Sequence, residues 1–129
     1  ALGALNRPSD RDQSLLRGDS EMWVGRFESS RANLAGNDLQ EFIEWLKSYQ
    51  DLDGNWPNNL KLLIEGHTDG NGVSSDNQDL SMQRAYHVAR VAAQLGIPKD
   101  RVQASGLGST FASGLDQQDR KVTVCWVLD

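Results

Sequence analysis

The fold of this chain depends on residues 64–95, which read IEGHTDGNGVSSDNQDLSMQRAYHVARVAAQL. The apolar run Leu60–Glu65, which overlaps the start of this segment, predicts a strand. Residues 68–79 are rich in Gly, Asn, Ser and Asp, which predicts a long polar loop. Ser81 is then expected to cap a helix that stops at Gly96. The apolar face of that helix repeats at helical spacing and comprises Ala85, Val88, Ala92 and Leu95.

Two further elements are expected on the N-terminal side of this segment. The apolar and aromatic run Met22–Phe27 predicts a first strand. Asn37, followed by Gln40, has the pattern of a capping box and predicts a helix over Asp38–Tyr49. One face of this helix is apolar, with Leu39, Phe42, Ile43 and Leu46 at helical spacing.

Two strands are expected on the C-terminal side. Residues Arg101–Ser105 predict a third strand, and Lys121–Leu128 predict a fourth in which Val122, Val124 and Trp126 share one side. The order strand, helix, strand, helix, strand, strand predicts an α/β sandwich of the α+β kind, with two main helices packed on a mixed sheet of about four strands.

Composition indicates one soluble globular domain. Residues 1–21 are polar and without period, which predicts a flexible linker or N-terminal arm, and residues 22–129 are expected to form the domain. Apolar residues make up 38% of the chain and no apolar run could span a bilayer, so any membrane attachment is expected through segments outside this fragment. The net charge of -5 argues against nucleic-acid binding. The one cysteine, Cys125, lies in an apolar run and is expected to be buried and inert.

A carboxylate and a guanidinium are expected to meet at one edge of the sheet. Asp69 follows the strand that ends at Gly66, and Arg84 is expected near the start of the following helix. Ligands of α/β units gather where strands end and helices begin. A carboxylate and a guanidinium that do not fully neutralise each other form a receptor for a zwitterion, because Arg can bind a carboxylate with two hydrogen bonds.

These residues stand in a longer pattern that resembles a known family. The pattern Gly66-His67-Thr68-Asp69, followed by Asn77-x-x-Leu80-Ser81-x-x-Arg84-Ala85-x-x-Val88, is similar to the signature of the OmpA C-terminal, Pal and MotB family. The resemblance covers about Trp23 to Leu128, and its outer parts are Phe27, Asn33, Leu34, Gly106-Leu107-Gly108 and Asp119-Arg120-Lys121-Val122. This sequence departs from the family at Ala92, at Asp119 and in lacking a proline after Gly108.

The resemblance implies non-covalent binding of peptidoglycan through the diaminopimelate of its stem peptide. Asp69 would bind the ammonium of that residue and Arg84 its carboxylate. Asn77 would add hydrogen bonds, and Ser29, Ser30 and Arg120 fall where the family has further ligand contacts. Such a domain anchors an envelope protein to the cell wall in a Gram-negative periplasm, needs no cofactor and is not an enzyme.

Blander and rival interpretations remain open at this point. Asp69 and Arg84 could form a structural salt bridge. His67 could make a hydrogen bond with a structural role, and His87 is expected to face the solvent. A hydrolase would use Ser81, His67 and Asp69, but Ser81 is better explained as a helix cap.

Metal sites are not expected. The ligand spacings of zinc sites are absent, and Val73 interrupts the EF-hand pattern. The main alternative is a structural or protein-interaction domain of the same fold without wall binding. The parent protein type and the oligomeric state are left open, since Trp23, Trp45 and Trp56 are expected to be exposed but too scattered to form a dimer surface.

Overall fold

The computed structural model describes residues 21–34, 36–70, 72–112 and 119–128. Of the expected N-terminal arm, residues 1–20 lie outside the described part. The elements, in chain order, are β1 (Trp23–Arg26), α2 (Asn37–Lys47), β2 (Leu60–Gly66), α3 (Ser74–Gln94), the short 3-10 helix η1 (Lys99–Arg101), β3 (Val102–Gly106) and β4 (Lys121–Leu128). None of the helices in the described ranges combines the length and the apolar character that crossing a membrane requires.

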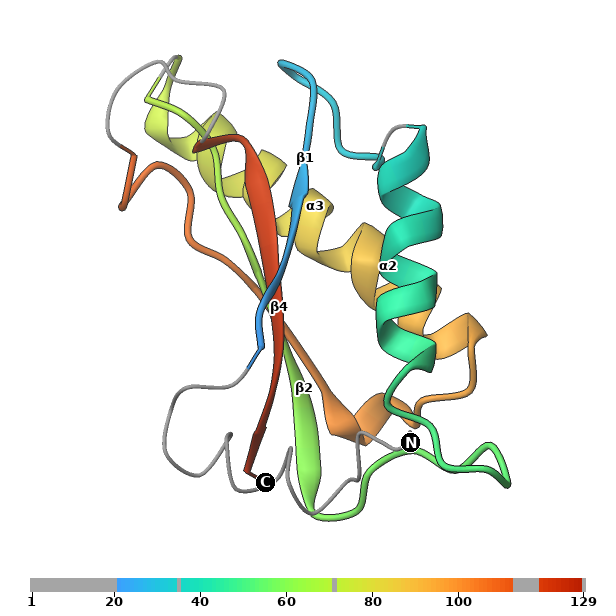
Figure 1. The fold of residues 1–129 in the computed structure, drawn as a ribbon. Coiled ribbons are helices and arrows are strands. Elements are labelled where there is room, and N and C mark those ends of the chain that lie inside the picture. The colour runs from blue at the N-terminus through green and yellow to red at the C-terminus, as the bar shows by residue number, and fades with distance from the viewer. Residues whose placement is uncertain (1–20, 35, 71, 113–118, 129) are drawn as a thin grey trace.

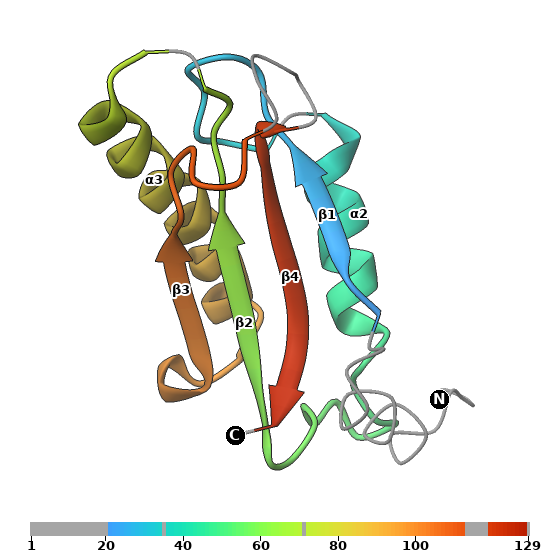
Figure 2. The same cartoon turned by 90° about the vertical axis from the view of Figure 1, so that its left-hand side faces the viewer.

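The strands form one mixed sheet in the order β1-β4-β2-β3. β4 lies between β1 and β2 and is antiparallel to both, whereas β2 and β3 are parallel. Helices α2 and α3 lie on the same face of the sheet (Figure 1), and the other face is open toward the viewer in Figure 2. The predicted βαβαββ architecture is therefore confirmed.

The core fills the space between the sheet and the two helices. Every second residue of β2 and of β4 is buried, which is the pattern of strands with one covered face. Val122, Val124 and Trp126 share the covered side, as predicted. The helical partners in the core are Phe42 and Leu46 of α2 and Ala85, Val88 and Ala92 of α3.

Aromatic rings form a continuous chain through this core. The neighbouring centroids lie 5.0–6.5 Å apart in the order Trp23, Phe42, Trp45, Tyr49, Trp126, Trp56. Trp23 is buried, and Trp45 and Trp56 are partly buried against the core. The expectation that these three tryptophans are exposed was wrong, because aromatic ring pairs at this spacing stabilise a packed cluster.

Both expected side-chain caps were wrong. Helix α2 begins at Asn37 itself after Gly36, and the pair Asn37 and Gln40 makes no capping hydrogen bond. Helix α3 begins at Ser74 rather than after Ser81, so residues 74–79, expected in a loop, form its first turns. The first turn of α3 carries Asp76, whose negative charge is favourable near a helix N-terminus.

Two glycines let α3 approach the sheet closely along those first turns. A Cβ atom added to Gly66 would lie 2.0 Å from the backbone oxygen of Ser81, and one added to Gly106 would lie 2.6 Å from the backbone nitrogen of Met82. The Ser81 hydroxyl is fully buried; it donates to the Gln78 carbonyl oxygen at 2.8 Å and accepts from the Gly108 N–H at 2.9 Å. Ser81 therefore joins α3 to the loop after β3.

We expect Ser81→Ala to lower the free energy of unfolding by ~1–3 kcal/mol, because the buried Gly108 N–H loses its acceptor. Urea unfolding followed by far-UV circular dichroism measures this change. A matched control is Ser75→Ala, which removes an exposed hydroxyl from the same helix. Equal stability of Ser81→Ala and the control would contradict the role assigned to the hydroxyl.

The burial of Cys125 and of His87 differs from what the sequence predicted. Cys125 is only partly buried, because its side chain alternates with Val124 and Trp126 and so lies on the open face of the sheet. Desolvation, aided by the nearby charge of Glu65, still raises the pKa of the Cys125 thiol. His87 is not fully solvent-facing: its Nε2 atom is buried without a hydrogen-bond partner, and desolvation lowers the pKa of the ring.

Candidate ligand-binding site

A small pocket brings together all six residues expected to bind a ligand. Its volume is about 60 Å³, and it is lined by Ser29, Ser30, Thr68, Asp69, Asn77, Leu80, Arg84 and Arg120. These residues follow β1, follow β2, lie in the first half of α3 and precede β4. The pocket therefore lies at the end of the sheet where β1 and β2 end and β4 begins. Figure 2 shows this end of the sheet at the top.

The turn after β1 presents Ser29 and Ser30 to the pocket. The Arg31 N–H donates to the Glu28 carbonyl oxygen at 3.1 Å and closes the turn. Ser30 has a φ of 63°, in the left-handed region that non-glycine residues adopt rarely. A turn with such backbone strain persists only if its surroundings hold it.

Arg84 supplies that support. Its guanidinium donates to the carbonyl oxygens of Arg31 at 2.8 Å, of His67 at 2.8 Å and of Glu28 at 3.2 Å. The side chain thus ties both ends of the Ser29–Ser30 turn to the end of β2. It is fully buried, and its guanidinium carbon lies 4.9 Å from the ring centroid of Phe27.

The surroundings of Arg84 differ from the expectation in two ways. Arg84 lies well inside α3, so it gains nothing from a helix N-terminus. Its hydrogen bonds go to carbonyl oxygens rather than to Asp69. The pKa of Arg84 is lowered to about 10: desolvation is the largest cause, the negative charge of Asp69 opposes it, and the positive charge of Arg120 adds to the lowering. The guanidinium is still charged at neutral pH.

Asp69 is paired with Arg120 instead. The Arg120 Nη1 atom lies 3.0 Å from Asp69 Oδ2, and Arg120 Nε also donates to the Phe27 carbonyl oxygen at 3.3 Å. A plain Asp69–Arg84 salt bridge is therefore not what this structure shows. The charged groups that line the pocket are one carboxylate and two guanidinium groups, which leaves the pocket with one excess positive charge.

Sequence reasoning missed Thr68 and Leu80 as lining residues, although both stand in the quoted signature. Thr68 is 2% exposed, and its Oγ1 atom is buried without a hydrogen-bond partner in the described structure. A buried hydroxyl without a partner is costly. Asn77 is 7% exposed, and no described residue forms a hydrogen bond with its side-chain amide. The pocket thus contains neutral polar groups with unused hydrogen-bonding capacity.

The rival catalytic arrangement is not assembled. The Ser81 hydroxyl is bound to Gln78 and Gly108, and neither of its bonds involves His67. His67 is 8% exposed; desolvation and the nearby charge of Lys121 lower its pKa, partly offset by Asp119. Among the residues that the structure describes, no group of three or more His, Cys, Asp or Glu side chains could hold a metal ion.

The chain is similar to a known family along most of its length. The model of the OmpA family matches residues 26–122. Over 64 residues this chain is 36% identical to outer membrane protein A of Serratia marcescens, and the match covers 50% of this chain and 18% of that protein. Over 48 residues it is 44% identical to the outer-membrane lipoprotein YfiB of Pseudomonas aeruginosa, covering 37% and 29%. The chain therefore spans less than a third of the length of these relatives.

Solved structures have the same fold. The peptidoglycan-associated lipoprotein of Burkholderia pseudomallei aligns with a TM-score of 0.63 and 26% identity, over 80% of this chain and 88% of that one. The C-terminal domain of Helicobacter pylori MotB aligns with a TM-score of 0.67 and 19% identity, over 83% and 85%.

Proposed function

Since this chain belongs to the OmpA family, we propose that its pocket binds peptidoglycan non-covalently through the diaminopimelate residue of the stem peptide. The domain would thereby anchor a larger envelope protein to the cell wall in a Gram-negative periplasm. The observation that carries the proposal is the convergence of Asp69, Arg84 and Arg120 with the unpartnered hydroxyl of Thr68 around one cavity. The name of the Burkholderia relative, a peptidoglycan-associated lipoprotein, supports it.

The charges of the pocket suit the free end of diaminopimelate, which carries an ammonium and a carboxylate on one carbon. The ligand ammonium would approach Asp69, where it competes with the Arg120 guanidinium that now lies 3.0 Å away. As Arg120 yields part of this contact, its planar donors become available to the ligand carboxylate. The ion pair between Asp69 and Arg120 thus exchanges for two ion pairs with the ligand.

The excess positive charge favours this exchange. Stem peptides carry further carboxylates, so a pocket with two guanidinium groups and one carboxylate attracts them. Arg84 contributes to this field from its buried position. The free hydroxyl of Thr68 and the amide of Asn77 can then donate to ligand oxygens, which would satisfy the Thr68 hydroxyl that now has no partner.

We expect Asp69→Ala to weaken binding of a diaminopimelate stem peptide by ~2–5 kcal/mol, because the ligand ammonium then lacks its counter-charge. A stem peptide with lysine in place of diaminopimelate lacks the terminal carboxylate and should bind the unaltered chain more weakly. Titration calorimetry of both peptides against both chains forms a complete cycle.

One control and one further pocket variant keep this experiment specific. Asp53→Asn removes an exposed carboxylate on the loop after α2 and should leave affinity unchanged. Thr68→Val keeps the shape of the side chain and removes its hydroxyl, so it should weaken binding without lowering stability. If the lysine peptide bound as tightly as the diaminopimelate peptide, recognition of the zwitterion would be wrong.

A second candidate is a domain of this fold that does not bind the wall. It is favoured by one observation: Asp69 is already paired with Arg120, and Arg84 is fully buried. Sedimentation with insoluble peptidoglycan separates the candidates. Retention that is lost on Asp69→Ala supports wall binding, whereas equal sedimentation of the chain with and without peptidoglycan supports the second candidate.

A further inference from the structure

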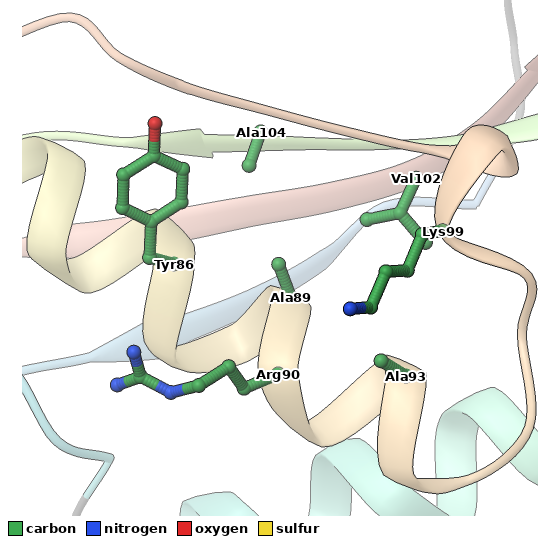
Figure 3. Close-up of a pocket in the computed structure, with 7 residues that line it drawn as sticks. All are labelled: Tyr86, Ala89, Arg90, Ala93, Lys99, Val102 and Ala104. Atoms are coloured by element: carbon green, nitrogen blue, oxygen red, sulfur yellow. The ribbon is translucent and has the colours of Figure 1, made fainter.

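A second, larger cavity lies away from this pocket, between α3 and the edge strand β3 (Figure 3). Its volume is about 410 Å³. Small apolar side chains line its base, with Ala89 and Ala93 from α3 and Val102 and Ala104 from β3. Tyr86 also lines it and is 47% exposed, which is high for a large aromatic side chain. We refer to this cavity as the α3–β3 groove.

One wall of the groove is an unpaired strand edge. β3 is an outer strand of the sheet, and among the described strands it pairs only with β2. The Leu107 N–H donates to the Gly66 carbonyl oxygen, so the backbone of Leu107 points toward β2. Because strand residues alternate in direction, the backbone groups of Gln103 point the same way. Those of Val102, Ala104 and Gly106 point outward, toward the free edge.

The ends of this outward edge are occupied within the fold, and its centre is not. The carbonyl oxygen of Gly106 accepts from the Gln78 side chain at 2.7 Å, and its N–H contacts the Met82 sulfur at 3.1 Å. The Val102 N–H donates to the Lys99 carbonyl oxygen. No described residue forms a hydrogen bond with the outward N–H and C=O of Ala104 or with the C=O of Val102.

The rim of the groove is positively charged in a chain of net negative charge. Arg90 and Lys99 both line it and are exposed, and no acidic side chain does. Neither cation has an ion-pair partner among the described residues. Figure 3 shows the two side chains coming from different elements, Arg90 from α3 and Lys99 from the segment before β3.

We propose that the α3–β3 groove binds an extended acidic peptide segment, which adds to β3 as a fifth strand of the sheet. Its backbone would pair with the free groups of Ala104 and Val102, as in other cases of strand addition to an exposed sheet edge. Since alternate side chains of a strand share a face, an apolar residue would enter the groove. Acidic residues two positions to either side would reach Arg90 and Lys99.

The probe for this proposal is a blocked seven-residue peptide of threonines with valine at its centre and glutamate two positions to either side. Amide chemical shifts of the whole chain, measured during titration at millimolar concentration, should move most at Ala104. A matched peptide with lysine in place of glutamate should bind at least fivefold more weakly. An isomer with glutamates directly beside the valine should also bind more weakly, because its charges face away from the groove.

Protein variants separate backbone pairing from charge. Ala104→Pro removes the outward N–H without touching the bonds to β2 and should weaken binding at least tenfold, since proline is tolerated on the free side of edge strands. Lys99→Gln should weaken binding of the glutamate peptide severalfold, whereas Lys47→Gln, the same change at an exposed position of α2, should not. Circular dichroism checks that each variant is folded.

Three results would overturn the proposal. One is full binding of the peptide to folded Ala104→Pro, because the backbone edge is then not the site. Another is that the glutamate peptide causes no amide chemical-shift changes while Lys99→Gln makes the chain self-associate. The positive charge would then serve only to prevent strand pairing at this edge. The third is concentration-dependent dimerisation that Ala104→Pro abolishes, which would assign the edge to a second copy of this chain.

Discussion

Arg84→Ala is expected to lower the free energy of unfolding by ~3–5 kcal/mol and to abolish peptidoglycan binding together. The substitution removes the donors of three hydrogen bonds, to Glu28, Arg31 and His67, inside the fold. It leaves carbonyl oxygens without partners and a cavity beside Phe27. The Ser29–Ser30 turn also loses the group that ties it to β2, so the pocket loses one wall as well as one charge.

The measurement pairs urea unfolding with calorimetric titration of the diaminopimelate peptide. Arg84→Lys is the informative second variant, because it keeps the positive charge but cannot reach three acceptors with a planar fork. We expect it to recover little stability and little affinity. Asp69→Asn serves as the contrast: it should weaken binding while stability changes far less. If Arg84→Ala retained full stability, the structural role of the guanidinium would be wrong.

Gly66→Ala is expected to be the most damaging single-methyl change, lowering the free energy of unfolding by ~3 kcal/mol. The added Cβ would lie 2.0 Å from the carbonyl oxygen of Ser81, which is backbone of α3 and cannot rotate away. Either α3 moves away from β2 or the end of the strand bends. Both displace Thr68 and Asp69, so ligand affinity should fall with stability.

Gly54→Ala is the matched control for this glycine. Gly54 has a φ of +83° and open space around its Cβ position, so alanine there costs only the left-handed backbone, ~1 kcal/mol. Gly66→Ala should exceed it clearly in urea unfolding. Similar losses in the two variants would show that crowding against Ser81 is relieved without cost.

The sequence was informative where physical patterns are local. Alternation of apolar residues in β2 and β4 sufficed to assign their buried faces, since a strand with one covered face has a period of two. The signature from Gly66 to Val88 likewise placed Asp69, Asn77 and Arg84 around one cavity. These features depend on spacing along the chain, which the sequence records directly.

Features that depend on contacts between distant segments were not predictable. The start of α3 at Ser74 was missed because Ser, Asp and Asn favour loops. Contacts of Gln78 with the end of β3, and of Ser81 with the loop that follows β3, hold those turns in a helix. The hydrogen-bond acceptors of Arg84 were missed because they are backbone carbonyl oxygens. Every residue has one, so the sequence does not mark which of them accept. The pairing of Asp69 with Arg120 joins residues 51 positions apart.

The chain of aromatic rings has a practical consequence for all of these experiments. All four tryptophans of the protein belong to this series of rings. The rings lie between α2, the sheet and the loop after α2, and not around Asp69. Intrinsic fluorescence should therefore report loosening of α2 from the sheet, and the indoles of Trp56 and Trp126, whose ring centroids lie 6.5 Å apart, should exchange excitation energy. A ligand entering the pocket should leave that emission almost unchanged, so a spectral shift during titration would reveal a movement of α2.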